Sequence, residues 1–100
     1  MPSDARYLVR IEHPVPDFVQ WKKAFDDDPV SRKMMRVRRY RILRPMEDQK
    51  YVMADLEFDT SSDAEKFRAA ILDLWRNAEA KGIIMKPQAR IVEVVEFKEL

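Results

Sequence analysis

A chain of 100 residues is the size of one domain with a single hydrophobic core. Its 19 Lys and Arg nearly balance its 18 Asp and Glu, and a net charge of +1 gives no general attraction to nucleic acid or membranes. The absence of cysteine excludes disulfides, thiolate metal ligands and cysteine nucleophiles, and a single glycine excludes phosphate-binding glycine loops. Without signal-peptide features or an apolar run of membrane-spanning length, the chain is expected to be cytoplasmic.

A strand and a short helix are predicted first. Residues 5–12 alternate apolar and polar side chains, which predicts a strand that the prolines after it end. Asp17 is the expected N-cap of a short amphipathic helix. Its apolar face contains Phe18, Trp21, Ala24 and Phe25. A second helical segment is expected over residues 29–35, with Asp28 as its cap.

A hairpin is predicted in the middle of the chain. Residues 37–43 form an arginine-rich strand, and residues 51–58 form a strand with a regular apolar face. Residues 45–48 are typical of a turn, and so short a connection predicts antiparallel pairing.

The most regular apolar stripe predicts a long second helix that opens at residues 60–63. Ser62 and Glu65 match a capping box at its start, and Gly82 suits a left-handed cap at its end. The stripe comprises Ala64, Phe67, Ile71, Leu74, Trp75 and Ala78. Residues 83–85 are predicted to be a buried connection, and residues 89–97 a last strand that is apolar on both faces.

The predicted order of elements is β-α-β-β-α-β, the ferredoxin-like plan of the α+β class. Residues 1–100 would form one domain, with two helices on one face of a four-stranded antiparallel sheet. The opposite face would carry Leu8, Tyr51 and Met53 together with apolar residues of the last strand. Large exposed apolar patches are uncommon, so we expect a second copy to cover this face and the chain to be a homodimer.

Three motifs resemble the dimeric α/β-barrel superfamily, to which antibiotic-biosynthesis monooxygenases belong. They are residues 13–18 (HPVPDF) leading to Trp21, residues 56–59 (LEFD) leading to residues 64–67 (AEKF), and Gly82-Ile83 ahead of Pro87. The similarity covers nearly the whole chain and is greatest to small bacterial members. It implies a homodimeric α/β barrel with a pocket between sheet and helices in each subunit. That superfamily includes monooxygenases, polyketide cyclases, muconolactone isomerases, haem-degrading enzymes and stress-response proteins, and a fold does not select among activities.

His13, the sole histidine, is the candidate general acid or base, because a pKa near 6.5 suits proton transfer at neutral pH. The alternative is a histidine that hydrogen-bonds the backbone at a strand end. The candidates for lining a pocket for a flat apolar ligand are Trp21, Phe25, Tyr40, Trp75 and Met85. Their alternative role is ordinary core packing. One histidine without acids at ligand spacing predicts no metal site, and no cofactor is expected.

Seven positive charges fall within thirteen residues. They are Arg32, Lys33, Arg36, Arg38, Arg39, Arg41 and Arg44. A surface for phosphate, carboxylate or nucleic acid is one interpretation. Because a strand alternates its side chains between two faces, pairing with acids is the favoured one. Asp55 is expected opposite Arg38 or Arg39 in the hairpin, and the glutamates at 93, 96 and 99 are candidates to meet the arginines across a dimer interface.

The favoured function is binding of a small apolar or aromatic ligand in the pocket. The second hypothesis is a cofactor-independent monooxygenase or polyketide-cyclase-type enzyme in which His13 accepts a proton from a polycyclic phenol. For haem degradation the resemblance would require an axial histidine on the second helix, and residues 62–81 contain none. A nucleic-acid role rests on the arginine strand alone, so no nucleic-acid partner is expected.

Overall fold

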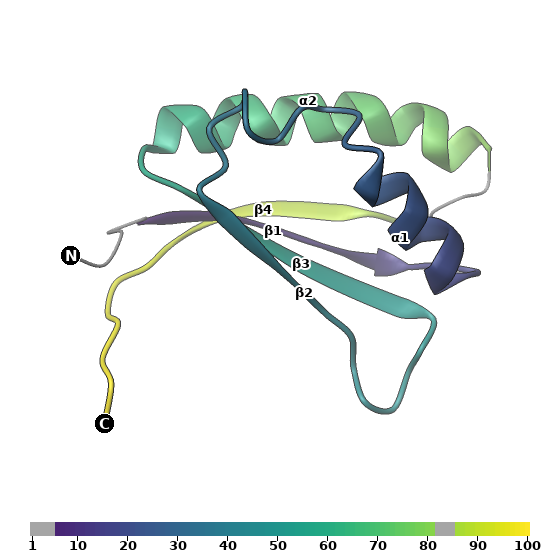
Figure 1. Cartoon of the computed structure of the whole chain (residues 1–100), viewed down its shortest axis with the longest axis horizontal. Helices are drawn as coiled ribbons and strands as arrows, with labels where there is room; N and C mark the ends of the chain where they lie inside the picture. Colours follow the sequence, from purple (N-terminus) through teal and green to yellow (C-terminus); the bar gives the residue numbers. More distant parts are fainter. Residues whose placement is uncertain (1–5, 82–85) are drawn as a thin grey trace.

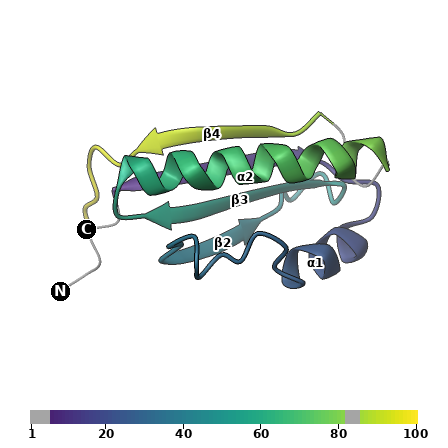
Figure 2. The ribbon, with the colours of Figure 1, turned by 90° about the horizontal axis from the view of Figure 1, so that it is seen from above.

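A computed structural model of the chain describes residues 6–81 and 86–100. The elements follow in the order β1 (Tyr7–Pro14), α1 (Phe18–Asp26), β2 (Arg39–Leu43), β3 (Tyr51–Phe58), α2 (Ser61–Ala80) and β4 (Gln88–Glu93). They form two layers, with the helices on one face of a four-stranded sheet (Figure 1). Figure 2 shows α2 running along the sheet, with α1 and the segment after it beside α2 on the β2 side. The predicted β-α-β-β-α-β order and α+β class are confirmed.

The sheet has the strand order β2-β3-β1-β4, and every neighbouring pair is antiparallel. The two central strands, β1 and β3, supply most of the core of the sheet because they have a strand on each side. Their register places Val9 opposite Leu56 and Ile11 opposite Ala54. Residues opposite each other in antiparallel strands share a face, so these apolar side chains all point toward the helices.

The core lies between the helices and this covered face of the sheet. Its buried members are Val9, Ile11, Val15, Trp21, Val52, Ala54, Leu56, Phe58, Ala64, Phe67, Ile71 and Trp75. Helix α2 contributes four of them at spacings of three and four, which is the spacing of one helical face. Phe67 of α2 reaches Phe58 of β3 with 5.3 Å between ring centroids.

A side chain caps the N-terminus of each helix. Asp17 caps α1 as predicted, and its carboxylate accepts from the backbone N–H groups of Val19 and Gln20. The predicted capping role of Ser62 is wrong, because α2 begins at Ser61 and its cap is Thr60, whose hydroxyl accepts from the Asp63 N–H at 3.1 Å. Gly82, the predicted C-terminal cap, and the predicted connection at residues 83–85 lie outside the described residues.

Several strand boundaries differ from the prediction. β1 extends to Pro14, which pairs with Tyr51 at the strand end, where a missing N–H interrupts little of the ladder. β2 begins at Arg39 rather than at residue 37. β4 ends at Glu93 rather than at residue 97, because Glu93 lies opposite Tyr7, the first residue of β1, and beyond it the neighbouring strand has ended.

The C-terminal arm, residues 94–100, leaves the sheet after one hydrogen bond from the Val94 N–H to the Arg6 carbonyl at 2.8 Å. It runs away on the face opposite the helices (Figure 1). Val95, Phe97 and Leu100 are more than four-fifths exposed on this arm. Val95 and Phe97, the exposed apolar residues of the predicted strand end, are therefore not buried within the single chain.

The predicted helical segment at residues 29–35 is wrong. Residues 27–38 form successive turns, and Asp28, Ser31 and Arg36 have positive φ values of 54°, 54° and 70°, which interrupt any helix. Asp28 does act as a local cap, because its carboxylate accepts from the Arg32 N–H at 2.8 Å. This turn segment packs on the core through Val30, Met35 and Val37.

The open face of the sheet, opposite the helices, is more polar than the sequence predicted. Leu8, Tyr51 and Met53 lie on this face as expected, but charged residues alternate with them. The predicted hairpin register is also wrong, because Asp55 lies opposite Arg41, and Arg39 lies opposite Glu57. The connection at residues 44–50 is too long to fix the register in the way that a two-residue turn does.

Candidate functional site

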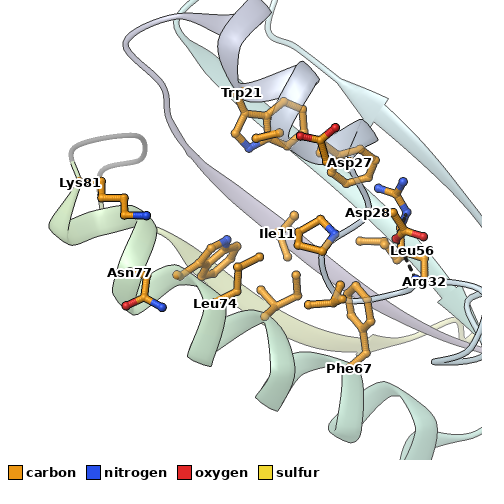
Figure 3. A pocket seen from close by; sticks show the side chains of 16 residues that line it. Ile11, Trp21, Asp27, Asp28, Arg32, Leu56, Phe67, Leu74, Asn77 and Lys81 are labelled. Carbon is orange, nitrogen blue, oxygen red and sulfur yellow. Dashed lines mark hydrogen bonds and ion pairs between the residues drawn. The ribbon is translucent and has the colours of Figure 1, made fainter.

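A cavity of about 290 Å³ lies between the sheet and the helices and is partly open to solvent (Figure 3). Its floor includes Ile11 of β1 and Leu56 of β3. One wall comes from α1 and the turn segment, and the other comes from α2. The α2 wall consists of Phe67, Ile71, Leu74 and Trp75, with Asn77 and Lys81 at its end. The lining is mostly apolar, which is the usual character of a small-molecule pocket.

Aromatic rings form a continuous row along the α1 wall. Trp21 stacks on Phe25 with 5.1 Å between centroids, and Phe18 packs against Trp21 at 5.9 Å. Tyr40 of β2 meets the other side of Phe25 edge-on at 5.2 Å. The spacing of 18, 21 and 25 along α1 produces this row, because residues three and four apart lie on one helical face.

The structure places the predicted pocket residues in three different positions. Trp21, Phe25 and Trp75 line the cavity. Tyr40 lies behind Phe25 and lines a neighbouring hollow instead. Met85 lies outside the described residues.

His13, the predicted acid or base, is completely buried at the end of β1. Its Nδ1 lies 3.0 Å from the Pro14 carbonyl oxygen, so Nδ1 carries the proton and donates, and Nε2 is left as an acceptor. Nε2 has no partner among the described residues. The imidazole is held edge-on between Trp21 and Trp75, at 6.0 and 5.7 Å between centroids. These indoles separate His13 from the cavity, whose lining does not include it.

Burial lowers the pKa of His13, because an apolar surrounding disfavours the imidazolium form. The hydrogen bond to the Pro14 carbonyl acts in the opposite direction but is the smaller effect. His13 is therefore neutral at pH 7, with Nε2 unprotonated, and its ring packs against the two indoles that line the cavity.

Polar residues stand at the two lips of the cavity. Asp27, Asp28 and Arg32 lie at one lip and Asn77 and Lys81 at the other (Figure 3). Sequence reasoning did not assign these five residues to a pocket. Arg32 was identified in the sequence only as part of the basic run. Its position at the lip depends on the turns of residues 27–38, which no periodic pattern in the sequence predicts.

A second hollow of about 240 Å³ adjoins the cavity. It is lined by Asp28, Arg32, Lys33, Val37, Arg38, Arg39 and Tyr40. Asp28 and Arg32 line both spaces, so the two hollows meet at this pair. The Arg32 guanidinium lies over the Phe25 ring at 3.9 Å and over the Tyr40 ring at 4.9 Å, and its Nε is 3.2 Å from an Asp28 carboxylate oxygen.

Most of the basic run is paired with acids, which agrees with the favoured interpretation. Arg38 pairs with Asp59 at 3.6 Å and Arg39 with Glu57 at 2.9 Å. Arg41 pairs with Asp55 at 3.3 Å and lies opposite it in the hairpin. The prediction that Arg38 or Arg39 is the partner of Asp55 is therefore wrong.

Asp55 is the centre of the open face and is 2% exposed there. Arg10 donates to both of its carboxylate oxygens, at 2.8 and 2.9 Å, and Arg41 adds a third contact. These hydrogen bonds, above all those from Arg10, lower the pKa of Asp55 despite its burial. Tyr51 donates to Glu12 at 2.8 Å on the same face, and that bond raises the pKa of Tyr51.

Within residues 6–81 and 86–100, no cluster of three or more His, Cys, Asp or Glu side chains is arranged to hold a metal ion. Among the same residues, no helix combines the length and the apolar character that crossing a membrane requires.

No family model matches the sequence, and no curated protein does. A solved structure does match over 97% of this chain and 95% of its own, with a TM-score of 0.70 and 17% identity. The chain has the ferredoxin-like fold. The matching structure is described as a dimeric ferredoxin-like protein from an uncultured marine organism. At this identity the similarity shows the fold, and the ferredoxin-like fold is compatible with many activities.

Proposed function

We propose that the protein binds a small apolar or aromatic molecule in the cavity between the sheet and the helices. The observation that carries the proposal is a cavity of about 290 Å³ lined mainly by aromatic and aliphatic side chains. Ligand pockets have volumes of roughly 300 to 1,000 Å³, so this one suits a single small molecule.

The row of rings along α1 favours a flat ligand. Trp21 and Phe25 stack on each other and both line the cavity, and across it stands Trp75. A planar apolar molecule placed between these walls would gain dispersion contacts and offset stacking on indole or phenyl faces. Removal of its surface from water would contribute about 25 cal/mol for each Å² buried.

Calorimetric titration with naphthalene-2-methanol, a neutral flat probe, tests the proposal. Saturable binding with one site per chain is expected. Ala24 lines the cavity from α1, so Ala24→Phe should fill part of the space and weaken binding about tenfold or more. Val19→Phe on the same helix is the matched control, because Val19 is 75% exposed, and it should leave the affinity unchanged. Equal affinity for both variants would disprove binding in this cavity.

A second candidate function is an enzyme of the cofactor-independent monooxygenase or polyketide-cyclase type, with His13 as acid or base. Its support is the neutral imidazole, whose acceptor Nε2 lacks a partner among the described residues next to Trp21 and Trp75. This function would require Trp21 or Trp75 to move, because both indoles pack against His13 and line the cavity, whereas His13 does not line it. His13→Gln should abolish proton abstraction from a naphthol substrate and spare binding of naphthalene-2-methanol, whereas undiminished turnover would remove His13 from the mechanism.

We further propose that the protein is a homodimer whose subunits meet through their open faces. The support is the dimeric state of the matching structure, the apolar residues Leu8 and Met53 on the open face, and the exposed Val95 and Phe97 of the C-terminal arm. Light scattering at micromolar concentration should give twice the mass of the chain. Met53→Glu should give a monomer, and a monomeric parent protein would overturn the proposal.

A further inference from the structure

The cavity and the second hollow differ in character, although they share a boundary. The cavity is walled mainly by aromatic and aliphatic groups, whereas the cations Arg32, Lys33 and Arg38 line the second hollow. Arg39 also borders this hollow, although its side chain pairs with Glu57 of the open face. A molecule that extends from one space into the other would pass the Asp28–Arg32 pair, which lines both. The arrangement places a basic compartment at one end of an apolar one.

Three contacts hold Arg32 at this boundary. Its side chain is 14% exposed, and its guanidinium lies over the Phe25 and Tyr40 rings. The ion pair with Asp28 is made through Nε, and a guanidinium has five N–H donors, so a single such contact leaves donors for a further acceptor. A donor group that packing has already oriented loses little entropy when it binds an anion.

The acids around the second hollow offset part of its charge. Arg38 and Arg39 are paired with Asp59 and Glu57, and Asp28 stands beside Arg32. With these three acids counted against the four cations of the hollow, one positive charge remains, and Asp27 at the same lip of the cavity offsets it. A site with so little excess positive charge disfavours a phosphate monoester, which carries close to two negative charges, relative to a singly charged anion.

We propose that the ligand of this protein is an amphipathic monocarboxylate. Its apolar body lies in the cavity against Trp21 and Phe25, and its carboxylate lies at the boundary beside Arg32 with Lys33 nearby. The planar carboxylate matches the planar guanidinium fork, which favours this head group among singly charged anions. This inference deepens the function proposed above and depends on it, since it requires the cavity to bind the apolar body.

Lys81, at the opposite lip of the cavity, is the alternative binding partner for the carboxylate. It lies beside Asn77 and is also a cation that lines the cavity. Arg32 is favoured over Lys81 because the guanidinium is fixed by two rings and adjoins the basic hollow, whereas the described contacts give Lys81 no such support. An anion held at Lys81 would lie across the cavity from the basic run.

Calorimetric titrations with 2-naphthoate and naphthalene-2-methanol test the proposal, because the two probes share a ring system and differ in charge. The acid should bind about tenfold tighter than the alcohol, the range expected for one charge-assisted hydrogen-bonded contact. Arg32→Gln should bring the ratio of the two affinities close to one, and this ratio is the readout because Arg32 also lines the cavity and any change in apolar binding affects both probes. Lys33→Gln, at an exposed position, should reduce the advantage by a smaller factor and also covers the case in which Arg32→Gln fails to fold.

Three other outcomes would each overturn part or all of the proposal. Equal binding of acid and alcohol by the parent protein would overturn the carboxylate assignment and leave the apolar cavity as the binding site. Binding of neither probe would overturn both proposals. Loss of the advantage in Lys81→Gln, with the advantage kept in Arg32→Gln and in Lys33→Gln, would assign the anion to the opposite lip and contradict the role of Arg32.

Discussion

The two faces of the sheet each bury one ionisable side chain, and the two are handled in different ways. His13 on the covered face is completely buried, and Asp55 on the open face is 2% exposed. His13 lies between two indoles with a single hydrogen bond to the backbone. Asp55 is held by two arginines that lie on the same face. The surroundings of His13 are apolar, whereas those of Asp55 supply opposite charges.

The pKa values follow from this difference. The pKa of His13 is lowered because burial disfavours its cation, whereas the pKa of Asp55 is lowered because the arginines, Arg10 above all, stabilise its anion. The comparison shows that a central position in a sheet does not determine whether a buried ionisable side chain is neutral or charged. The charge state depends on whether apolar helix side chains or charged side chains surround the group. This difference fits the proposed apolar ligand on the covered face and the proposed protein partner on the open face.

The largest expected effect is a loss of packing on the covered face. Phe67 is 1% exposed and touches both the cavity and Phe58, so Phe67→Ala should lower the free energy of unfolding by about 3 to 5 kcal/mol. Urea denaturation measures the change. Lys66→Ala, at the neighbouring exposed position of α2, should stay within about 0.5 kcal/mol, and a similar loss in both variants would contradict the assignment of the core.

A smaller effect is expected at the centre of the open face. Asp55→Asn keeps the shape of the side chain but removes its charge, and it should lower the free energy of unfolding by about 2 kcal/mol at pH 7. Because the pKa of Asp55 is lowered on folding, this contribution is present above the unfolded value near 4 and disappears as pH falls through the folded value. Denaturation curves of both proteins should therefore converge in acid.

Arg39→Gln is the matched control on the same face. The Arg39–Glu57 pair is also an ion pair of the β2–β3 hairpin, but its arginine is 57% exposed. Exposed pairs contribute little, so the change should be about 0.5 kcal/mol or less. A cost in Arg39→Gln as large as that in Asp55→Asn would show that burial of Asp55 is not what makes its pairing important.

The smallest expected effect is a pH slope from the covered face. The pKa of His13 is lowered in the folded state, so the unfolded chain binds a proton first as pH falls below about 6.5 and stability declines there. Melting temperatures between pH 7.5 and 5.5 should fall for the parent protein and change less for His13→Gln. A parent protein that gains stability over this decrease in pH would contradict a neutral, desolvated His13.

The sequence was sufficient for the elements whose pattern is local. The period of two in β1 and β3 and the stripe of α2 predicted the order of elements and the ferredoxin-like fold. They also predicted that Trp21, Phe25 and Trp75 face the same space, because each lies on the apolar face of a helix that must cover the sheet. The role of Asp17 as the N-cap of α1 was predictable from its side chain alone.

The remaining features depend on contacts between distant residues. Whether β4 continues past Glu93 is decided by where β1 begins, and the partner of Asp55 is decided by a register that a long connection leaves unset. Arg32 reaches the cavity through turns at Asp28 and Ser31 with positive φ values, and neither residue type requires that conformation. His13 was found by its chemistry, but its separation from the cavity by two indoles is a matter of packing.

Methyl NMR during a titration with naphthalene-2-methanol tests most directly that the ligand occupies the covered face. Signals of Ile11, Leu56 and Ile71, which line the cavity, should shift as the probe binds. Signals of Leu8, Leu43 and Val92, which lie on the open face, should remain in place. Shifts confined to the open face, or no shift at a saturating concentration of the probe, would contradict the account.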